Sequence, residues 1–459
     1  MNGATTSGHG QSKSSERKEG VKRYSSRRRK CIIAIVAFSV AASVAALGAT
    51  AASARHRDNV TIRWMMFQTP NLPLSYWQDI VNRFEAKNPD IKVQLLPSPT
   101  LDRDAYAKQL LASGQFPDVL QSITLQDYTK QGLLYAWTPA EQKSWGVLFP
   151  HAGQLSGKQY SIPNNSQVIP LVYYNKSIFA KLHLKVPTTW AQFLAVCKKI
   201  KASGKTPIAI GGSQDTWASW IFLGGMFSTD VLGKDPTWIL KRKQNKVHFT
   251  DPLVAKVFNA WAGLKKAGYF NKDALSLNYA GMQQEFLDGK EAMYPMGTWA
   301  ASATAVGGAK FGVGVFRLPP FSGPPVQAVF TNGGAVVSAK SAHLDAAKKL
   351  AKFWSLDPQT NATLAKNDAG LIATKGFKQP SGLPSVFYQT AALYQQKSTK
   401  QHPLKNVDVM FFNNGDRASV PGMDTFYATA AQNILLGRSV RSQLQFLDTQ
   451  WNKAAKSNG

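Results

Sequence analysis

The chain has 459 residues, 44% of them hydrophobic, which is enough to bury a large core and is a length typical of two or three domains. Lys and Arg outnumber Asp and Glu by 54 to 26, so the formal net charge is +28. Only two cysteines are present, and one lies in an N-terminal segment that we expect to be removed, so an intramolecular disulfide is excluded from the mature protein.

The first 54 residues predict a disordered basic tail that leads into a secretory signal. Residues 1–30 are rich in Ser, Gly, Lys and Arg, and an apolar run follows over residues 31–47. The triplet Ala52-Ser53-Ala54 has the small residues after which a signal peptidase cuts. We therefore expect a secreted, periplasmic or cell-surface protein, with an uncleaved membrane anchor as the alternative. Residues 55–459 keep 45 basic and 24 acidic side chains, a net charge of +21, so the tail does not account for the basic character.

After this segment the pattern predicts a strand, a helix and a second strand. Residues 60–67 are apolar and rich in β-forming types, and residues 91–95 alternate between apolar and polar. Between them, four apolar residues recur with the spacing of one helix face: Trp77, Ile80, Val81 and Phe84. A helical crossover of this kind favours a parallel, right-handed connection.

The same rhythm continues towards the C-terminus. Further helices are predicted over residues 105–112, 190–200, 252–264, 346–354 and 424–455, the last with a break at Gly437, and further strands over 117–120, 207–210, 292–296 and 335–338. Thr124 and Asp127 resemble a capping box that opens another helix. Cys197 shares the apolar face of its helix with Trp190 and Ile200, which indicates a buried thiol rather than a nucleophile. Alternating strands and helices without a long linker predict an α/β protein with more than one sheet and intertwined lobes.

Motifs of known catalytic chemistry are absent from the sequence. It has no His-Glu-x-x-His, Gly-x-Ser-x-Gly, Walker-type or Gly-x-Gly-x-x-Gly segment, and its seven histidines show no paired metal-ligand spacing. We therefore expect no catalytic residues, no metal and no cofactor. Because no sequence rule pairs the carboxylates into a glycosidase dyad or rules one out, a secreted carbohydrate-active enzyme stays open as an alternative.

Aromatic and amide side chains follow several predicted strands. Trp217 and Trp299 each come shortly after one, and amides occur in segments 164–165 and 332–334. Ligands of α/β proteins gather at the carboxyl ends of strands, so these side chains indicate a binding site. A sugar offers apolar C–H faces to indole rings and hydroxyl groups to amides and carboxylates. The alternatives are core packing for the indoles, plain turns for the Asn-Gly pairs and a strand-bracketing role for Asp118.

Several stretches, taken in order, resemble one protein family. They are residues 77–85 with 88–93, Gly114 with 116–119, 172–176 with 187–193, 205–209, 293–299 and 333–338. Together they are similar to the extracellular solute-binding proteins of ABC importers, in the sugar-binding branch that includes maltose-binding protein. Each stretch is modest by itself, and the resemblance rests on their order over nearly the whole chain after Ala54.

The resemblance implies a two-lobed α/β fold of the periplasmic-binding-protein type, with a hinge and a ligand cleft between the lobes. Lobe 1 would comprise residues 55–172 and 327–357, and lobe 2 residues 173–326 and 358–459. A small polar solute, first of all a mono- or oligosaccharide, would be held between the lobes, and the loaded protein would dock on the membrane subunits of the importer. Trp299 matches a ligand-stacking position of the family. Further contacts are expected at Gln68, Asp118, Asn164, Trp217, Asn332 and Gly333.

The basic charge leaves two further alternatives. It could attract an anionic solute such as a sugar phosphate, or it could reflect a solvated exterior near anionic envelope polymers. A nucleic-acid-binding protein would explain the charge, but the predicted secretory signal and the thin spread of basic residues after Lys30 argue against it. We expect a monomer that binds no nucleic acid.

Overall fold

The computed structural model describes residues 59–100, 102–149, 151–213, 215, 217–332, 334–410 and 415–458. Residues 57–459 form one compact unit that contains all of the elements below. The predicted tail and signal segment, residues 1–54, lie outside the described residues, and so does Gly333. Within the described part of the chain, no helix combines the length and the apolar character needed to cross a membrane.

The first sheet is built on the predicted strand–helix–strand unit. Its order is β12-β3-β1-β2, where β1 spans Val60–Met66, β2 spans Ile91–Pro97, β3 spans Val119–Gln121 and β12 spans Ala335–Val337. Strand β1 pairs in parallel with both β2 and β3, as the predicted crossover requires, whereas β12 runs antiparallel to β3. Between β1 and β2, helix α1 (Leu74–Lys87) buries the predicted stripe of Trp77, Ile80, Val81 and Phe84.

Further elements complete the part of the molecule around this sheet, which we call the first lobe. They are α2 (Arg103–Ala112), α3 (Gln126–Thr129), α4 (Pro139–Gln142), β4 (Gln154–Leu155), β5 (Lys158–Gln159), α12 (Leu344–Leu356) and α13 (Pro358–Asp368). Three buried indoles lie at the centre of its core. The ring centroids of Trp64 and Trp77 are 5.3 Å apart, and those of Trp77 and Trp354 are 4.9 Å apart. These contacts fix β1, α1 and α12 against one another.

The predicted capping box at Thr124 and Asp127 is wrong. Helix α3 begins at Gln126, with Leu125 at its N-cap and no side-chain cap. The Thr124 hydroxyl instead donates to the Asp104 carboxylate over 2.7 Å. The Thr124 backbone N–H, which Asp127 would accept in a capping box, also donates to the Asp104 carboxylate, over 2.8 Å. Asp127 pairs with Lys108 instead, so tertiary contacts replace the local ones.

The second sheet is the centre of what we call the second lobe. Its order is β10-β7-β9-β8, where β7 spans Leu171–Asn175, β8 spans Thr206–Ile208, β9 spans Glu291–Met296 and β10 spans Val313–Arg317. Strand β9 pairs in parallel with β8 and antiparallel with β7. The helices of this lobe are α5 (Lys176–Lys181), α6 (Trp190–Ala202), α7 (Trp217–Phe227), the π-helix η1 (Ser228–Leu232), α8 (Trp238–Lys243), α9 (Pro252–Lys266), α10 (Tyr279–Leu287), the 3-10 helix η2 (Thr298–Ala301), α11 (Ala303–Val306), α14 (Ser385–Gln395), α15 (Met423–Leu435) and α16 (Val440–Asn458).

Local sequence explains several of these elements. A capping box of Thr189 and Gln192 opens α6, and Pro252 stands at the first turn of α9. Cys197 is buried in the core of the lobe, which raises the pKa of its thiol and confirms the predicted structural role. The predicted break between the last two helices is confirmed by Gly437, whose φ of 90° ends α15.

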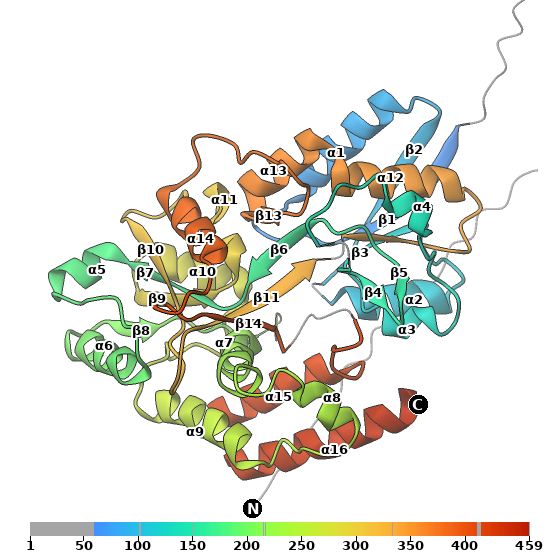
Figure 1. The fold of residues 1–459 in the computed structure, drawn as a ribbon. Coiled ribbons are helices and arrows are strands. Elements are labelled where there is room, and N and C mark those ends of the chain that lie inside the picture. The colour runs from blue at the N-terminus through green and yellow to red at the C-terminus, as the bar shows by residue number, and fades with distance from the viewer. Residues whose placement is uncertain are drawn as a thin grey trace, which may run out of the picture. The chain divides into compact units, whose positions relative to one another are not determined.

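A third sheet connects the two lobes. Its order is β13-β6-β11-β14, with bounds Leu371–Ile372 for β13, Asn165–Val168 for β6, Val326–Asn332 for β11 and Lys405–Asp408 for β14. The chain passes from the first lobe to the second through β6 and returns through β11, and the two strands lie antiparallel near the middle of Figure 1. The predicted residue limits of the lobes stay a prediction. Leu364 and Ala365 of α13, which that prediction assigns to lobe 2, pack in the core of the first lobe.

Candidate functional site

A cavity of about 190 Å³ is lined by residues from both lobes and from the connecting sheet. Its lining includes residues that follow the carboxyl ends of β1, β3 and β9, together with the starts of α7 and α10, the ends of α12 and α13 and the segment before α15. Carboxyl ends of parallel strands meet at one edge of a sheet, so segments distant in sequence converge there.

Three aromatic residues of the second lobe, Trp217, Tyr279 and Trp299, form what we call the aromatic side of the cavity. Trp217 begins α7, Tyr279 begins α10 and Trp299 lies in η2 after β9. The Trp217 ring centroid is 6.3 Å from that of Trp299, with an angle of 70° between the rings, and 5.0 Å from that of Tyr279. Both indoles are half-buried, so each keeps part of its ring surface available to a ligand. Such faces suit the apolar C–H surface of a sugar ring.

The turn after β9 positions Trp299. A Cβ atom on Gly297 would lie only 2.0 Å from the Trp299 ring, so glycine is needed for the indole to fold back over the turn. The Tyr173 hydroxyl donates to the Gly297 carbonyl over 3.1 Å, and the Asn71 amide donates to the Trp299 carbonyl over 3.2 Å. The turn is therefore anchored from both lobes, which limits the ordering that a ligand must impose.

Three amides, Gln121, Asn164 and Asn165, form what we call the amide side. Gln121 ends β3, Asn165 begins β6 and Asn164 precedes it. Each residue is at most 2% exposed, and each has a side-chain oxygen without a hydrogen-bond partner among the described residues. An unsatisfied buried acceptor costs about 1–3 kcal/mol, so a donor supplied by a ligand would relieve that cost.

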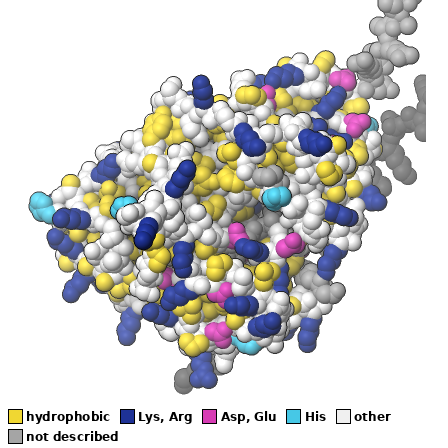
Figure 2. Space-filling model, viewed as in Figure 1, with side chains coloured by type: hydrophobic (Ala, Val, Ile, Leu, Met, Phe, Trp, Pro, Cys, Tyr) yellow, Lys and Arg dark blue, Asp and Glu magenta, His cyan; other side chains and the backbone are white. Residues whose placement is uncertain are grey.

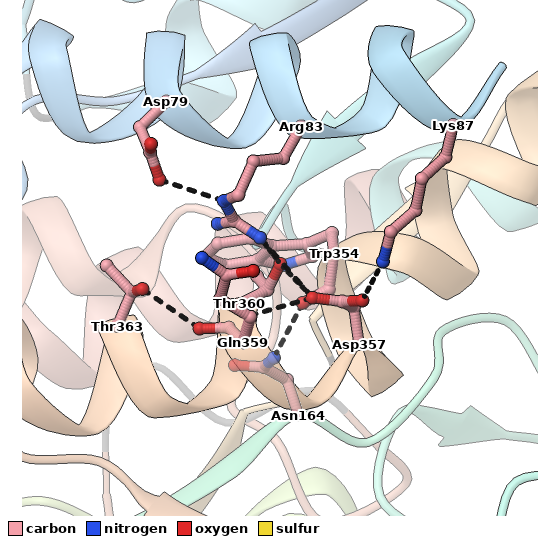
Figure 3. A network of polar contacts seen from close by, with 9 residues as sticks. All are labelled: Asp79, Arg83, Lys87, Asn164, Trp354, Asp357, Gln359, Thr360 and Thr363. Atoms are coloured by element: carbon pink, nitrogen blue, oxygen red, sulfur yellow. Dashed lines mark hydrogen bonds and ion pairs between the residues drawn. The ribbon is translucent and has the colours of Figure 1, made fainter. Parts of the chain in front are cut away.

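A polar network supports the amide side from behind (Figure 3). Asp357 accepts from Arg83 over 3.3 Å and from Lys87 over 2.8 Å, and it also caps the start of α13. Burial alone would raise the pKa of Asp357, but the hydrogen bonds from Lys87 and from the start of α13 outweigh it and lower the pKa. The carbonyl of Trp354, one turn earlier, accepts from Asn164 over 3.4 Å. The network thus links α1 to the α12–α13 corner and orients Asn164.

Asp368 is a cavity-lining carboxylate that sequence reasoning missed. It ends α13, and its Oδ1 atom accepts from Asn71 over 3.3 Å, so one amide bridges Asp368 and the Trp299 carbonyl. Burial raises the pKa of Asp368 to about 7, although the hydrogen bond from Asn71 acts in the opposite direction. Near neutral pH this group is therefore present both as an acid and as a carboxylate, and can donate to or accept from a hydroxyl group.

Charged groups in the lining are mostly acidic. Among the described residues that line the cavity, Asp104, Asp368 and Asp424 stand against one cation, Arg103. Burial raises the pKa of Asp104 and lowers that of Arg103, whose guanidinium lies over the Phe67 ring at 4.3 Å. This set does not offer the paired cations that hold a phosphate well, and it favours an uncharged solute. No group of three or more His, Cys, Asp or Glu side chains within the described residues is arranged to hold a metal ion.

The structure brings together three of the seven residues predicted for the site. Trp217, Trp299 and Asn164 line the cavity. Gln68 is exposed and does not line it, although both of its neighbours do. The backbone of Asn332 ends β11, but its side chain and all of Gly333 lie outside the described residues.

The structure places Asp118 away from the cavity. This residue precedes β3, at the end of the strand opposite to Gln121, and does not line the cavity. Its carboxylate accepts from the Arg63 backbone over 2.8 Å and from the Ser341 hydroxyl over 2.5 Å. It brackets the strand, which is the structural alternative given above.

Comparisons with known proteins agree with this architecture. A family model described as bacterial extracellular solute-binding protein matches residues 70–361. The multiple sugar-binding protein of Streptococcus mutans is 27% identical over 351 residues, which cover 74% of this chain and 81% of that protein. The sn-glycerol-3-phosphate-binding periplasmic protein of Brucella abortus is 29% identical over 218 residues, 44% of this chain and 46% of that one. A solved chitin oligosaccharide binding protein superposes with a TM-score of 0.76 at 22% identity, covering 87% of this chain and all of that chain, so the two-lobed fold is shared.

Proposed function

The chain belongs to the family of bacterial extracellular solute-binding proteins, and from this premise we propose that it captures an uncharged mono- or oligosaccharide in the cavity between its lobes and delivers it to the membrane subunits of an ABC importer. Membership in an extracellular family locates the protein in the periplasm or at the cell surface. The names of the sugar-binding relative and of the chitin oligosaccharide binding structure support a carbohydrate.

The observation that carries the proposal is the pairing of the aromatic side with the amide side. A sugar ring has an apolar C–H face that stacks on an indole and a rim of hydroxyls that donate to carbonyl oxygens. Trp217 and Trp299 supply the first kind of contact, and the unpaired oxygens of the three amides supply the second. Neither kind requires an activated nucleophile or a metal.

Capture is expected to draw the lobes together. The aromatic side belongs to the second lobe, while Gln121 belongs to the first, so a solute gains its full contacts only when both surround it. A ligand with higher affinity for the closed arrangement shifts the equilibrium towards it by that difference in affinity. The strands β6 and β11 that connect the lobes are the natural place for the bending.

A thermal-shift screen of residues 55–459 tests the proposal against neutral mono- and oligosaccharides, sugar phosphates, uronic acids, polyols and amino acids. A ligand at a hundred times its Kd adds about 2.7 kcal/mol to the free energy of unfolding, which raises the Tm of a chain of this size by a few degrees. We expect a saturable shift from a neutral sugar that Trp299→Ala abolishes. Shifts from amino acids alone would refute the carbohydrate assignment.

A second candidate is an anionic solute such as a sugar phosphate. It is favoured by the glycerol-phosphate-binding relative, by the net charge of +21 after residue 54 and by Arg103 in the lining. The three carboxylates in the same lining weigh against it. A shift from sugar phosphates that exceeds that from the neutral parents and disappears in Arg103→Gln would establish this candidate instead.

The remaining parts of the proposal concern the whole chain. We further propose that the signal peptide is cleaved after Ala54, that the protein is monomeric and that it catalyses no reaction; membership in a family of binding proteins supports the last point. The intact mass of the exported protein tests the cleavage, since an uncleaved anchor would retain residues 1–54. Incubation of any hit sugar with the protein, followed by chromatography, tests the absence of turnover.

A further inference from the structure

A long stretch of the chain carries many lysines and no carboxylate. The whole sequence holds 26 Asp and Glu in 459 residues, or about one in every 18, yet residues 142–214 contain none. The same stretch contains nine lysines, seven of them within residues 176–205. A run of this length without acidic residues leaves local positive charge that nothing in the same segment compensates.

The fold gathers these lysines at one end of the second lobe, so the thin spread of basic residues expected after Lys30 is wrong for this region. Helix α5 follows the end of β7, and α6 leads into the start of β8, so both helices meet the same edge of the second sheet. The end of α9 joins them, because the Lys201 ammonium donates to the Ala267 carbonyl over 2.5 Å. We call the following exposed residues the lysine-rich end: Lys181, Lys185, Lys198, Lys199, Lys201, Lys205, Lys265 and Lys266.

The positive charge of the lysine-rich end is not neutralised by ion pairs. None of its eight ammonium groups pairs with a carboxylate among the described residues; Lys201 and Lys205 donate to backbone carbonyls instead. The nearby carboxylate of Glu285 is paired with Lys290 at 2.7 Å, and Asp288 accepts from a neighbouring glutamine. In Figure 2, the left end of the molecule, where α5 and α6 lie in Figure 1, displays basic side chains in dark blue.

The lysine-rich end and the cavity lie at opposite edges of the same sheet. Strands β8 and β9 are parallel; Lys205 precedes β8, whereas Trp217 and Trp299 follow the carboxyl ends of the two strands. Contacts made at the lysine-rich end therefore leave the mouth of the cavity free.

We propose that the lysine-rich end docks on the anionic headgroup surface of a membrane. The choice of occupant rests on the proposed function, since the importer that takes the solute lies in a membrane. It also rests on the residue type: all eight cations are Lys, a flexible point charge that suits a diffuse layer of phosphates, and none is Arg, whose planar fork suits a defined ligand. Docking would keep the receptor near its importer by electrostatic attraction, which salt weakens.

The experiment measures co-sedimentation of residues 57–459, the compact unit that contains every described element, with two kinds of vesicle. One kind is phosphatidylcholine alone, and the other is phosphatidylcholine mixed with phosphatidylglycerol. The test variant replaces four exposed lysines of the lysine-rich end: Lys181→Gln, Lys185→Gln, Lys198→Gln and Lys199→Gln. The control variant removes the same number of charges from exposed lysines in and before α12 and after β13: Lys340→Gln, Lys349→Gln, Lys375→Gln and Lys378→Gln.

We expect the unaltered unit to bind the anionic vesicles at low salt and to be released as salt rises. The test variant should bind at least about tenfold more weakly and the control variant within about twofold of the unaltered unit, because each surface lysine contributes separately. Equal losses in the two variants would show attraction through net charge alone and overturn the proposal. So would binding to DNA without binding to vesicles, which would restore the nucleic-acid alternative. Solute affinity of the test variant, measured in parallel, should be unchanged; failure of the carbohydrate assignment would leave the vesicle result standing.

Discussion

The aromatic side and the amide side of the cavity differ in the contacts that their side chains make in the protein without a solute. Trp217, Tyr279 and Trp299 pack against one another, so the second lobe already supplies favourable ring–ring contacts to all three. The three amides are buried more deeply, and each leaves an oxygen unpaired. One side is a preformed platform, and the other is a set of acceptors whose burial is compensated only by a ligand.

This difference indicates how selectivity and affinity are divided. Stacking on an indole tolerates many sugars, since every pyranose has an apolar face. Hydrogen bonds to fixed buried acceptors depend on where the hydroxyls lie, and a solute without them leaves the oxygens unpaired. We expect substitutions on the aromatic side to lower affinity for all ligands, and substitutions on the amide side to change the ranking among ligands.

The largest effect is expected from Trp299→Ala, which removes a platform ring. Loss of the stacking face should weaken sugar binding by about tenfold to a hundredfold, equivalent to about 1.4–2.8 kcal/mol. Calorimetric titration with the sugar found in the screen measures it. Trp190→Ala is the matched control, because Trp190 packs on Phe193 outside the cavity. The control should lower the Tm and leave the Kd unchanged; a similar loss of affinity in both variants would refute the platform.

Gln121→Leu should lower the affinity for the solute without lowering the Tm of the free protein. Removing a buried oxygen that has no partner relieves a cost in the free protein, so the Tm should stay or rise while affinity falls by about tenfold. Gln159→Leu offers a contrast, because Gln159 is equally buried and also has an unpaired side-chain oxygen, but its amide nitrogen donates to two backbone carbonyls outside the cavity, and both bonds would be lost. That variant should lose stability and keep its affinity. A lower Tm with unchanged affinity in Gln121→Leu would contradict the role of the amide side.

Gly297→Ala tests whether the turn after β9 positions the indole. The new methyl group would collide with the Trp299 ring, which must then rotate away, and we expect affinity to fall by about threefold to tenfold. Gly263→Ala in α9 is the control, since a Cβ there meets nothing within 4 Å and alanine favours the helix by about 0.5–1 kcal/mol. Unchanged affinity in Gly297→Ala would show that the ring has another resting place.

The remaining effect concerns the pH dependence of stability and not affinity. Asp368 has its pKa raised by burial to about 7 in the folded protein, against about 4 in an unfolded chain. Between these values the folded state binds more protons than the unfolded state, so the free energy of unfolding falls as pH rises from about 4 to 7. Asp368→Asn removes this contribution, and its Tm relative to the parent should increase from pH 5 to pH 8. The slope will not vanish, because burial also raises the pKa of Glu291 to about 7. A Tm difference that does not change with pH would contradict the buried carboxylate.

The sequence indicated which strands end at the cavity, but it indicated fewer of the individual side chains that line it. The rule that ligands gather at carboxyl ends of parallel strands led to Trp217 and Trp299, because a short strand precedes each. Asp118 was expected from the family resemblance and not from this rule, and it lies within the predicted strand 117–120, whereas the observed strand β3 begins at Val119. Gln121, the true last residue of β3, would have been chosen with the correct boundary. Such boundaries are set by pairing with β1 and β12, which local sequence does not reveal.

Asp368 and Tyr279 show what sequence patterns do not contain. Both lie at the ends of helices, α10 and α13, that were not predicted from the sequence. Their place in the cavity follows from the packing of α13 against the first lobe and from the contact between Tyr279 and Trp217. These are tertiary consequences of the fold, whereas the buried stripe of α1 follows from spacing alone and was predicted correctly.

The most direct test of the account is a crystal structure of the protein with the solute selected by the screen. We predict a sugar ring stacked on Trp299 or Trp217, with hydroxyl groups donating to the side-chain oxygens of Gln121, Asn164 and Asn165. A solute bound outside this cavity would contradict the account. An anionic group held by Arg103, with neither indole in contact, would contradict it equally.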